Sequence, residues 1–315
     1  MPAVAVIIVN YGTAGLVIDH MPAVLSELDA FPGSTVHIVD NASPGGDAAE
    51  LAAAFDGEAR VEVIAAPENG GFAYGNNRGL EAIGQRTDRP LVFFLNPDAR
   101  PRPGALTRMV ETLLREPGAG VVGPRLVNDR GEERASAFRR STPVQEYLAA
   151  GGVGGRLLGA RAIRVETVMP GEVKETTWIP GAAMLVRPEV IERVGGMDEG
   201  YFLYFEETDW LEAVGRAGFR VLVDGGAVVE HIEGVATGVV GARARARDLP
   251  DYWYASWRRF WIKNRSHATA ASAAAAFFLG LLISRLRRPR ANTSGARLGT
   301  FGSKCLWPAI RGAKP

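Results

Sequence analysis

Residues 93–100, FFLNPDAR, join a very apolar run to a carboxylate. The apolar run predicts a buried strand, which ends at Asn96, Pro97 and Asp98. Asn, Pro and Asp are frequent turn residues, so a simple turn is one explanation. Open α/β sheets also bind their ligands at the carboxyl ends of parallel strands. We therefore interpret Asp98 as a candidate active-site acid.

A second group of acids, Glu206, Glu207 and Asp209, lies within YFLYFEETDW (201–210). Acids in the first turn of a helix are stabilised by the helix dipole, by about 0.3–1 kcal/mol each. That structural role is one explanation. A carboxylate can also act as a general base, so this group is a candidate source of catalytic residues.

The first half of the chain predicts the scaffold that such residues need. Apolar runs alternate with stretches whose apolar residues recur at helical spacing. The runs are continuous, as expected for strands that are covered on both faces. The alternation predicts an α/β fold with a doubly wound, mostly parallel sheet. The predicted elements span residues 3–11, 14–28, 35–43, 47–55, 61–71, 73–84, 90–98 and 104–116.

The four predicted strands end in polar residues, which share one edge if the strands are parallel. Four independent polar endings are hard to explain as turns alone. We therefore expect a ligand site along that edge. The endings are Asn10-Tyr11, Asp40-Asn41, Glu68-Asn69 and Asn96 to Asp98.

The alternation breaks after residue 117. Residues 128–177 are rich in Gly and Arg and predict a loop-rich, partly mobile insertion. We find no internal repeat. The remaining predictions are a strand at 119–127, a strand and a helix within 176–195, a helix at 205–218, and a strand, a turn and a strand within 219–234.

Several glycines cluster in GGFAYGNNRG (70–79). Their spacing differs from the dinucleotide-binding pattern G-x-G-x-x-G, and no G-K-[ST] ending follows. Two explanations stay open. The glycines could form a tight strand-to-helix turn, or they could let the backbone approach a nucleotide at the helix N-terminus.

Composition narrows the classes of protein. The 315 residues suit one large domain or two small ones, and 36 basic residues stand against 35 acidic ones. This nearly equal number of basic and acidic residues does not indicate a protein that binds nucleic acid through a strongly basic surface. The single cysteine, Cys305, excludes an internal disulfide and a multi-cysteine metal site. We expect a reducing, cytoplasmic compartment, and the stretch after Met1 has no signal-peptide pattern.

Long motifs occur in a fixed order along residues 3–265: VIIVNYGT, IVDNAS, ENGGFAYGNNRG, FFLNPDA, WIPGAAMLVRPEVIERVGGMDEGYFLYFEETDW and VVEHIEG. With them the chain resembles the inverting glycosyltransferases of family 2, and most closely the bacterial rhamnosyltransferase-like branch that builds cell-surface polysaccharides. The resemblance implies a GT-A fold, with a Rossmann-like, mostly parallel sheet between helices. It also implies sugar transfer from a nucleotide-diphosphate donor, with dTDP-rhamnose as the candidate, to a hydroxyl of a glycan or lipid-linked acceptor.

The resemblance assigns roles to residues along the strand endings. The resemblance implies a divalent cation, Mn²⁺ or Mg²⁺, at Asp98, which ends the predicted strand at 90–98. The other assignments are Asn10 and Tyr11 lining the nucleotide pocket, Asp40 accepting a hydrogen bond from the pyrimidine, and Asn69, Gly71 and Asn77 along the ribose and diphosphate.

The sequence departs from the family's D-x-D pattern because Asp98 is the only acid in Asn96-Pro97-Asp98-Ala99. The donor's diphosphate oxygens, waters and one further side chain could complete an octahedral shell. His231 is the candidate for that side chain. The alternative is a packed, structural histidine.

The family usually has Glu-Asp where this chain has Glu206-Glu207. Position matching makes Glu207 the general base for a single in-line displacement, with Asp209 as the second choice. The residues expected to shape the acceptor and sugar pocket are Trp178, Pro180, Gly181 and Glu206.

Two other classes of protein stay open. A nucleotidyltransferase also uses an α/β domain and a metal acid, but VNYGTAGL (9–16) lacks a basic residue to bind a triphosphate. A non-catalytic sugar-binding protein on the same scaffold is the second, and the presence of Asp98, Glu207 and His231 counts against it.

The C-terminal segment changes character. We divide the chain into a catalytic domain, 1–241, and a basic, aromatic helical tail, 242–315. Residues 268–284 carry no charge, and Trp, Tyr and basic residues flank them. We predict peripheral attachment to the inner face of a membrane through residues 242–290. The alternative is a helix that packs on the catalytic domain or on a second copy in a homo-oligomer.

Overall fold

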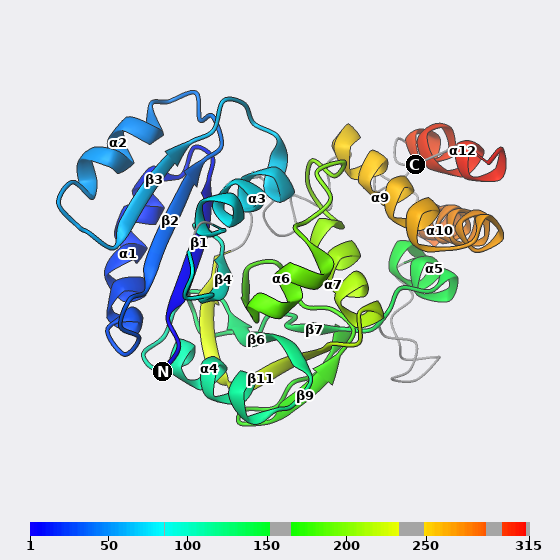
Figure 1. Ribbon diagram of the computed structural model, residues 1–315. Helices are drawn as coiled ribbons and strands as arrows, with labels where there is room; N and C mark the ends of the chain where they lie inside the picture. Colours follow the sequence, from blue (N-terminus) through cyan, green and yellow to red (C-terminus); the bar gives the residue numbers. More distant parts are fainter. Residues whose placement is uncertain (85, 152–164, 233–248, 288–297, 313–315) are drawn as a thin grey trace. The chain divides into compact units, whose positions relative to one another are not determined.

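The computed structural model describes residues 1–84, 86–151, 165–232, 249–287 and 298–312. The chain forms two compact units, which Figure 1 draws as a ribbon. Unit 1 comprises residues 1–138, 166–200 and 206–238, and unit 2 comprises residues 139–165, 201–205 and 239–315. The predicted division between residues 241 and 242 lies outside the described residues. Unit 2 combines most of the predicted tail with two earlier segments of the chain.

Unit 1 is built on a nine-stranded sheet in the order β3-β2-β1-β4-β10-β6-β11-β5, with β9 also paired to β11. Strands β1, β2, β3, β4, β6 and β11 run parallel, while β5, β9 and β10 run antiparallel to them. The predicted α/β fold with a mostly parallel sheet is confirmed. The strands are β1 (Val4–Asn10), β2 (Thr35–Asp40), β3 (Val61–Ala65), β4 (Leu91–Leu95), β5 (Ala99–Pro101), β6 (Ala119–Val127), β9 (Val173–Thr176), β10 (Ala183–Val186) and β11 (Arg220–His231).

Helices cover both faces of this sheet, because alternate residues of a strand point to opposite sides. Along β1, Val4 and Val6 pack in one core with α1 and α4, whereas Ala5 and Ile7 pack in the other with α3, α6 and α7. Figure 1 shows α1 and α3 on opposite sides of β1. The helices are α1 (Ala14–Leu28), α2 (Asp47–Ala54), α3 (Gly71–Ile83), α4 (Ala105–Arg115), α6 (Pro188–Val194) and α7 (Glu206–Arg216).

Two glycines of the 70–79 cluster bring α3 close to the sheet. A Cβ on Gly75 would lie 2.5 Å from Cγ1 of Val9, and one on Gly79 would lie 2.6 Å from Cγ2 of Ile7. Any larger residue at either position would push the helix away from β1. Close helix–sheet packing therefore explains these two glycines. The sequence alone could not distinguish a tight turn from a nucleotide-binding loop for this cluster.

The prediction of a strand, a turn and a strand at 219–234 is wrong. Residues Arg220–His231 form one strand, β11, whose register with β6 shifts between Asp224 and Val228. A Cβ on Gly225 would lie 2.0 Å from the Met169 carbonyl oxygen, and one on Gly226 would lie 2.1 Å from Nε of Arg108. The two glycines thus admit close neighbours at a strand irregularity and do not reverse the chain.

Unit 2 is helical and has its own aromatic core. Tyr254, Trp257, Phe260, Trp261 and Phe301 are all at most 1% exposed. The predicted insertion at 128–177 contributes α5 to this unit. Strand β7 belongs to unit 1 and forms a two-stranded sheet with β8. The helical C-terminal segment is confirmed. The helices of unit 2 are α5 (Pro143–Gly151), α9 (Asp251–Asn264), α10 (His267–Arg287), η2 (Gly302–Leu306) and α12 (Trp307–Ile310), and the two-stranded sheet consists of β7 (Ala137–Phe138) and β8 (Val165–Glu166).

Candidate active site

Asn10 and Asp40 end neighbouring parallel strands and face each other in register. Nδ2 of Asn10 donates to Oδ1 of Asp40 at 2.8 Å and to Oδ2 of Asp47 at 3.0 Å, while its Oδ1 accepts from the Thr13 hydroxyl at 2.7 Å. Asn10 is 0% exposed. Its side chain therefore lies beneath the sheet edge, not on a pocket wall as expected, and it positions Asp40.

Asp40 and Tyr11 stay at the edge itself. Asp40 is nearly buried, and its Oδ1 also accepts a hydrogen bond from the Ser43 hydroxyl at 2.6 Å. Tyr11 is 39% exposed. Tyr11 follows Asn10, the register partner of Asp40, and has an accessible ring, as the predicted nucleotide pocket requires.

Asn41 belongs to this site, although it was not among the predicted site residues. Its Nδ2 donates to Oδ1 of Asn69 and to the Gly71 carbonyl oxygen, both at 3.0 Å. The Gly71 N–H donates to the same Asn69 oxygen at 3.1 Å. Asn41 thus ties the end of β2 to the first residue of α3. The sequence signal was present, since Asn41 follows Asp40 in the same polar ending.

Asn77 does not join the other predicted nucleotide ligands. Its Nδ2 donates to the Met197 carbonyl oxygen and to Oε1 of Glu199, both at 2.8 Å, and its Oδ1 accepts from the Met197 N–H at 2.9 Å. All these contacts are to the loop between α6 and α7. Asn77 therefore holds that loop, which corrects its expected place along the ribose and diphosphate.

Asp98 and His231, the two predicted metal residues, come together. His231 pairs with Ala99 where β11 meets β5, which places its Nε2 3.2 Å from Oδ1 of Asp98. Both side chains are largely buried, at 6% and 13% exposure for Asp98 and His231. Nδ2 of Asn96 lies 3.5 Å from the same imidazole nitrogen. His231 therefore faces a carboxylate at the sheet edge and is not packed in the apolar core.

These residues fit a divalent cation. Oδ1 of Asn96 is buried and has no hydrogen-bond partner among the described residues. Buried acceptor atoms rarely lack a hydrogen-bond partner, so this oxygen points to a ligand that the protein alone does not supply. A carboxylate, an imidazole nitrogen and an amide oxygen are all donors that Mn²⁺ accepts. Within the described residues no group of three His, Cys, Asp or Glu gathers, so further ligands would come from the donor substrate and water.

The acids of α7 differ sharply in exposure. Glu206 is 3% exposed, and burial, reinforced by the neighbouring charge of Glu207, raises the pKa of the Glu206 carboxyl well above its usual value. Asp209 is also 3% exposed, whereas Glu207 is half-buried. Burial therefore favours the neutral form of Glu206, and Glu207 is the most accessible acid of the three.

Gly181 connects Glu207 with the sheet edge. A Cβ on Gly181 would lie 3.2 Å from Cε1 of Phe72, in the first turn of α3, and 3.6 Å from Cβ of Glu207. The Asn96 N–H donates to the carbonyl oxygen of Ala182 at 2.9 Å, next in the chain. The start of α7 therefore lies beside the start of α3 and the end of β4. The predicted base and the predicted metal acid thus belong to one region.

Trp178 does not offer the open ring face that was expected for a sugar. Its indole stacks on Phe138 with ring centroids 4.0 Å apart and an interplanar angle of 8°, and the residue is 7% exposed. Trp178 is part of the core that supports Gly181. The role of Gly181 in a sugar pocket stays a prediction, and the indole of Trp178 is covered by Phe138.

The backbone that leads into α7 is strained. Tyr204 and Phe205 have φ angles of 69° and 70°, in the left-handed region. That conformation costs about 1–2 kcal/mol per residue for side chains other than glycine. Strained backbone is concentrated at functional sites, so this pair agrees with a functional role for the acids that follow.

We expect the buried Glu206 to make stability depend on pH. A raised folded pKa stabilises the folded state fully below the unfolded pKa, near 4.5, and this contribution is lost as pH rises through the folded pKa. The free energy of unfolding should fall by up to about 1.4 kcal/mol per pH unit in that window. Glu206→Gln should remove this slope in urea unfolding measured from pH 5 to 8.

The matched control is Glu111→Gln, since Glu111 is an exposed glutamate of α4. The control should keep the slope of the unmodified protein. If Glu206→Gln and Glu111→Gln show the same pH dependence, then Glu206 ionises normally and is not held neutral.

Comparisons with known proteins agree with this geometry. The family described as "Glycosyl transferase family 2" matches residues 6–164, half of the chain. The chain is 28% identical over 213 residues to N-acetylglucosaminyl-diphospho-decaprenol L-rhamnosyltransferase of Mycobacterium tuberculosis, which covers 65% of this chain and 68% of that protein.

Solved structures show the same fold. The mannosyltransferase PcManGT from Pyrobaculum calidifontis, in complex with GDP-Man and Mn²⁺, is 17% identical with a TM-score of 0.56, covering 99% of this chain and 82% of that chain. TarS 1–349 of S. aureus, in complex with UDP-GlcNAc, is 14% identical with a TM-score of 0.56, covering 98% and 81%. This chain thus has a GT-A-like sheet flanked by helices.

Proposed function

The chain belongs to glycosyltransferase family 2, and on this premise we propose that it transfers a sugar, with inversion, from a nucleotide-diphosphate donor to a hydroxyl of a lipid-linked glycan. The observation that carries the proposal is the pair of Asp98 and His231 at 3.2 Å, beside the orphaned Oδ1 of Asn96. The mycobacterial relative's name supports a rhamnosyl donor, such as dTDP-rhamnose, and a polyprenyl-diphosphate acceptor.

Asp98 and His231 would hold the divalent cation, with Asn96 as a third ligand. When bound, a Mn²⁺ or Mg²⁺ ion supplies positive charge that stabilises the leaving diphosphate. The presence of Mn²⁺ in the PcManGT complex supports this assignment. Tyr11 and Asp40 would contact the base, and Asn69 and Gly71 would position the ribose and diphosphate at the N-terminus of α3, which favours anions.

Glu207 would act as the general base. The acceptor hydroxyl loses its proton to the Glu207 carboxylate while its oxygen forms the new bond to the anomeric carbon. The bond from that carbon to the diphosphate oxygen breaks in the same step, so the configuration inverts. The raised pKa of Glu206 disfavours a second negative charge next to the base. A displacement of this kind needs no nucleophilic side chain on the enzyme.

A thermal-shift panel tests the proposal. The full chain is heated with Mn²⁺ and each of several nucleotide sugars, nucleoside triphosphates or free sugars. A ligand at 100 times its Kd stabilises the folded state by about 2.7 kcal/mol, which corresponds to several degrees. Stabilisation by a nucleotide sugar, with nucleoside diphosphate released on adding acceptor, supports the transferase. Preference for a triphosphate supports a nucleotidyltransferase, and binding without release supports a sugar-binding protein.

The charge of unit 2 supports a location at a membrane. Its sequence holds 20 Lys and Arg against 3 Asp and Glu, whereas unit 1 holds 16 against 32. Basic surfaces attract the anionic lipids of the cytoplasmic leaflet. Among the described helices α10 is long and apolar enough to cross a membrane, by length and composition alone, and 28% of that apolar stretch is buried.

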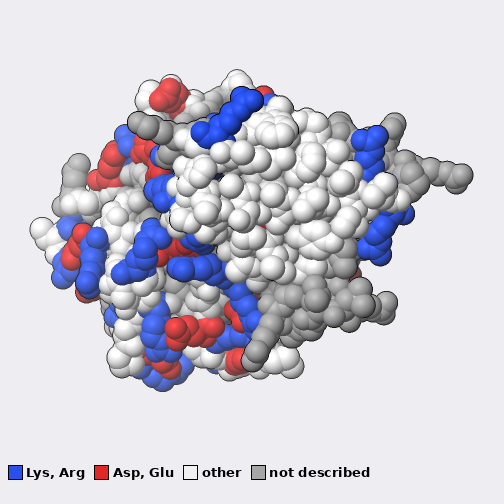
Figure 2. Space-filling view, turned by 90° about the vertical axis from the view of Figure 1, so that its right-hand side faces the viewer, with Lys and Arg blue, Asp and Glu red and all other residues white. Residues whose placement is uncertain are grey.

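Exposed apolar side chains accompany this charge. Figure 2 looks toward the C-terminal helices and shows a broad uncharged face with Lys and Arg at its margins. Leu286 and Trp307 are 72% and 53% exposed. We therefore infer peripheral attachment of a cytoplasmic enzyme to the inner membrane face. Of the predicted segment 242–290, residues 242–248 and 288–290 lie outside the described residues.

Reversing two charges at the end of α10 should weaken membrane binding. Each basic residue near an anionic surface contributes about 1 kcal/mol, so Arg285→Glu with Arg287→Glu should lower binding to phosphatidylglycerol vesicles by at least about tenfold. Flotation of the full chain measures it. The matched control is Arg130→Glu with Arg193→Glu, which reverses the charge of two exposed residues of unit 1. Equal flotation of the two double variants would exclude α10 as the attachment site.

A further inference from the structure

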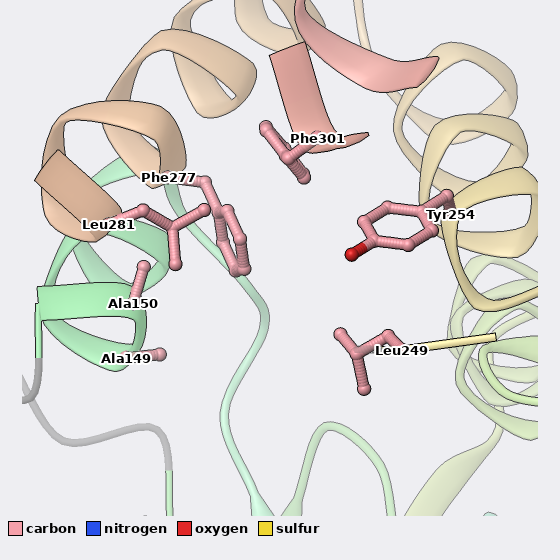
Figure 3. Close-up of a pocket in the computed structure, with 7 residues that line it drawn as sticks. All are labelled: Ala149, Ala150, Leu249, Tyr254, Phe277, Leu281 and Phe301. Carbon is pink, nitrogen blue, oxygen red and sulfur yellow. The ribbon is translucent and has the colours of Figure 1, made fainter. Parts of the chain in front are cut away.

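Unit 2 contains an apolar cavity of about 160 Å³ that the chemistry proposed for unit 1 does not use. Figure 3 shows the lining side chains converging on it from α5, α9, α10 and the segment before η2, with the phenol oxygen of Tyr254 directed toward the space. Tyr254 is the only lining residue with a polar side-chain group. The lining residues are Ala149, Ala150, Leu249, Tyr254, Phe277, Leu281 and Phe301.

The cavity has a buried floor and an accessible rim. Tyr254, Leu281 and Phe301 are at most 6% exposed and form the floor. Ala149 on α5 is exposed, and Phe277 on α10 is half-buried. The cavity therefore has apolar residues at both its buried and its accessible side.

Close packing fixes the wall between α5 and α10. A Cβ on Gly280 would lie 2.4 Å from the Tyr147 carbonyl oxygen and 2.9 Å from Cβ of Ala150. The two helices therefore meet at Gly280, one position before the lining residue Leu281. The cavity is bounded by helices in tight contact and is a formed site.

Size and chemistry limit what can occupy it. Sites for drug-sized ligands have volumes of about 300–1,000 Å³, whereas a dry apolar cavity of about 150 Å³ takes a molecule such as benzene. A sugar or a nucleotide base would bury many polar groups against one hydroxyl, which is unfavourable. A short length of one hydrocarbon chain fits both the volume and the lining.

Cations stand beside the cavity wall. Nζ of Lys304, which also pairs with Asp251, lies 5.9 Å from the centroid of the Tyr254 ring. Nη1 of Arg258 donates to the Lys304 carbonyl oxygen at 3.2 Å. With 20 basic and 3 acidic residues, unit 2 favours a ligand whose apolar chain carries an anionic head. A neutral hydrocarbon would make no use of this charge.

We propose that this cavity binds the polyprenyl chain of a lipid-linked acceptor, at the part of the chain nearest to its diphosphate. The inference rests on the proposed function, because it takes the acceptor to be a polyprenyl diphosphate. It adds a site for the chain to the site for the sugar. The cavity holds about one isoprene unit, and the basic residues of unit 2 attract the diphosphate.

Calorimetric titration of the full chain with farnesyl diphosphate tests this site. Ala149→Phe fills the rim, and Leu249→Trp fills it independently from the segment before α9. Each should weaken binding at least tenfold. Ala255→Phe is the matched control, since Ala255 is an exposed alanine of α9 that does not line the cavity, and it should bind as the unmodified protein does. Thermal midpoints confirm that each variant is folded.

Two competitors identify the source of the ligand. Inorganic diphosphate at the same concentration should not displace farnesyl diphosphate, and lysophosphatidylglycerol should displace it at least tenfold less well. Two results would contradict the proposal that this cavity binds the chain: undiminished binding in both filling variants, or displacement of farnesyl diphosphate by inorganic diphosphate alone. Equal displacement by lysophosphatidylglycerol overturns the acceptor assignment in favour of a general membrane lipid.

The failure of this inference is separable from failure of the proposed function. Nucleotide-sugar binding in Mn²⁺ depends on residues of unit 1, so the filling variants should keep the thermal shift of the unmodified protein. If that shift is absent from every variant and from the unmodified protein, the transferase proposal fails. If the thermal shift is present but the filling variants bind farnesyl diphosphate normally, only the proposed site for the chain is excluded.

Discussion

Asp98→Asn should abolish sugar transfer and leave the protein folded. The substitution removes the single carboxylate at the end of β4 and replaces it with a neutral amide of nearly the same shape. Loss of a cation's stabilisation of the leaving diphosphate is worth several kcal/mol, on the order of 10³-fold in turnover. Release of nucleoside diphosphate in Mn²⁺ measures the loss.

The stability of this variant should change little, because the Asp98 carboxylate faces His231 at 3.2 Å, at the sheet edge. Asp56→Asn is the matched control, since Asp56 is an exposed aspartate in a loop of the same unit. His231→Ala should have a smaller effect that high Mn²⁺ partly restores. Near-normal turnover of Asp98→Asn in either cation would exclude the metal role.

Glu207→Gln should leave donor binding intact and reduce turnover by roughly 10²- to 10⁴-fold, the usual contribution of a general base. The amide keeps the size of the side chain but cannot accept the proton of the acceptor hydroxyl. The thermal shift with nucleotide sugar should be unchanged, whereas product formation should fall. The difference between the two readouts separates loss of chemistry from loss of binding.

Glu206→Gln and Asp209→Asn are the controls for this assignment. Burial raises the pKa of Glu206 and favours its neutral form, so an uncharged amide there should cost far less activity than the same change at Glu207. Asp209 is buried within the first turn of α7. If either control is inactive while Glu207→Gln remains active, the base has been assigned to the wrong acid.

The sheet and its helices were predictable because their signals are local. The helix at 14–28 matches α1 residue for residue, since its apolar spacing continues from Ala14 to Leu28. Continuous apolar runs predicted the parallel strands β1, β2 and β4, so that Asn10, Asp40 and Asp98 end or follow strands whose carboxyl ends share one edge. The roles of these residues remain predictions until the variants are measured.

The misplaced residues depend on contacts that no local pattern encodes. Asn77 is bound to Met197, far along the chain, and Trp178 is covered by Phe138. The glycines at 225 and 226 resemble a turn, but neighbours from elsewhere in the chain make them part of one strand. Unit 2 is assembled from three separate segments, so a linear division of the sequence could not delimit it.

The most direct measurement of the central claim is the configuration of the product. The full chain is incubated with Mn²⁺, an acceptor and the nucleotide sugar selected by the thermal-shift panel, and the new linkage is read by nuclear magnetic resonance. Single in-line displacement predicts one nucleoside diphosphate released per sugar transferred and an anomeric configuration opposite to that of the donor. A retained configuration, or release of inorganic diphosphate in place of nucleoside diphosphate, would contradict it.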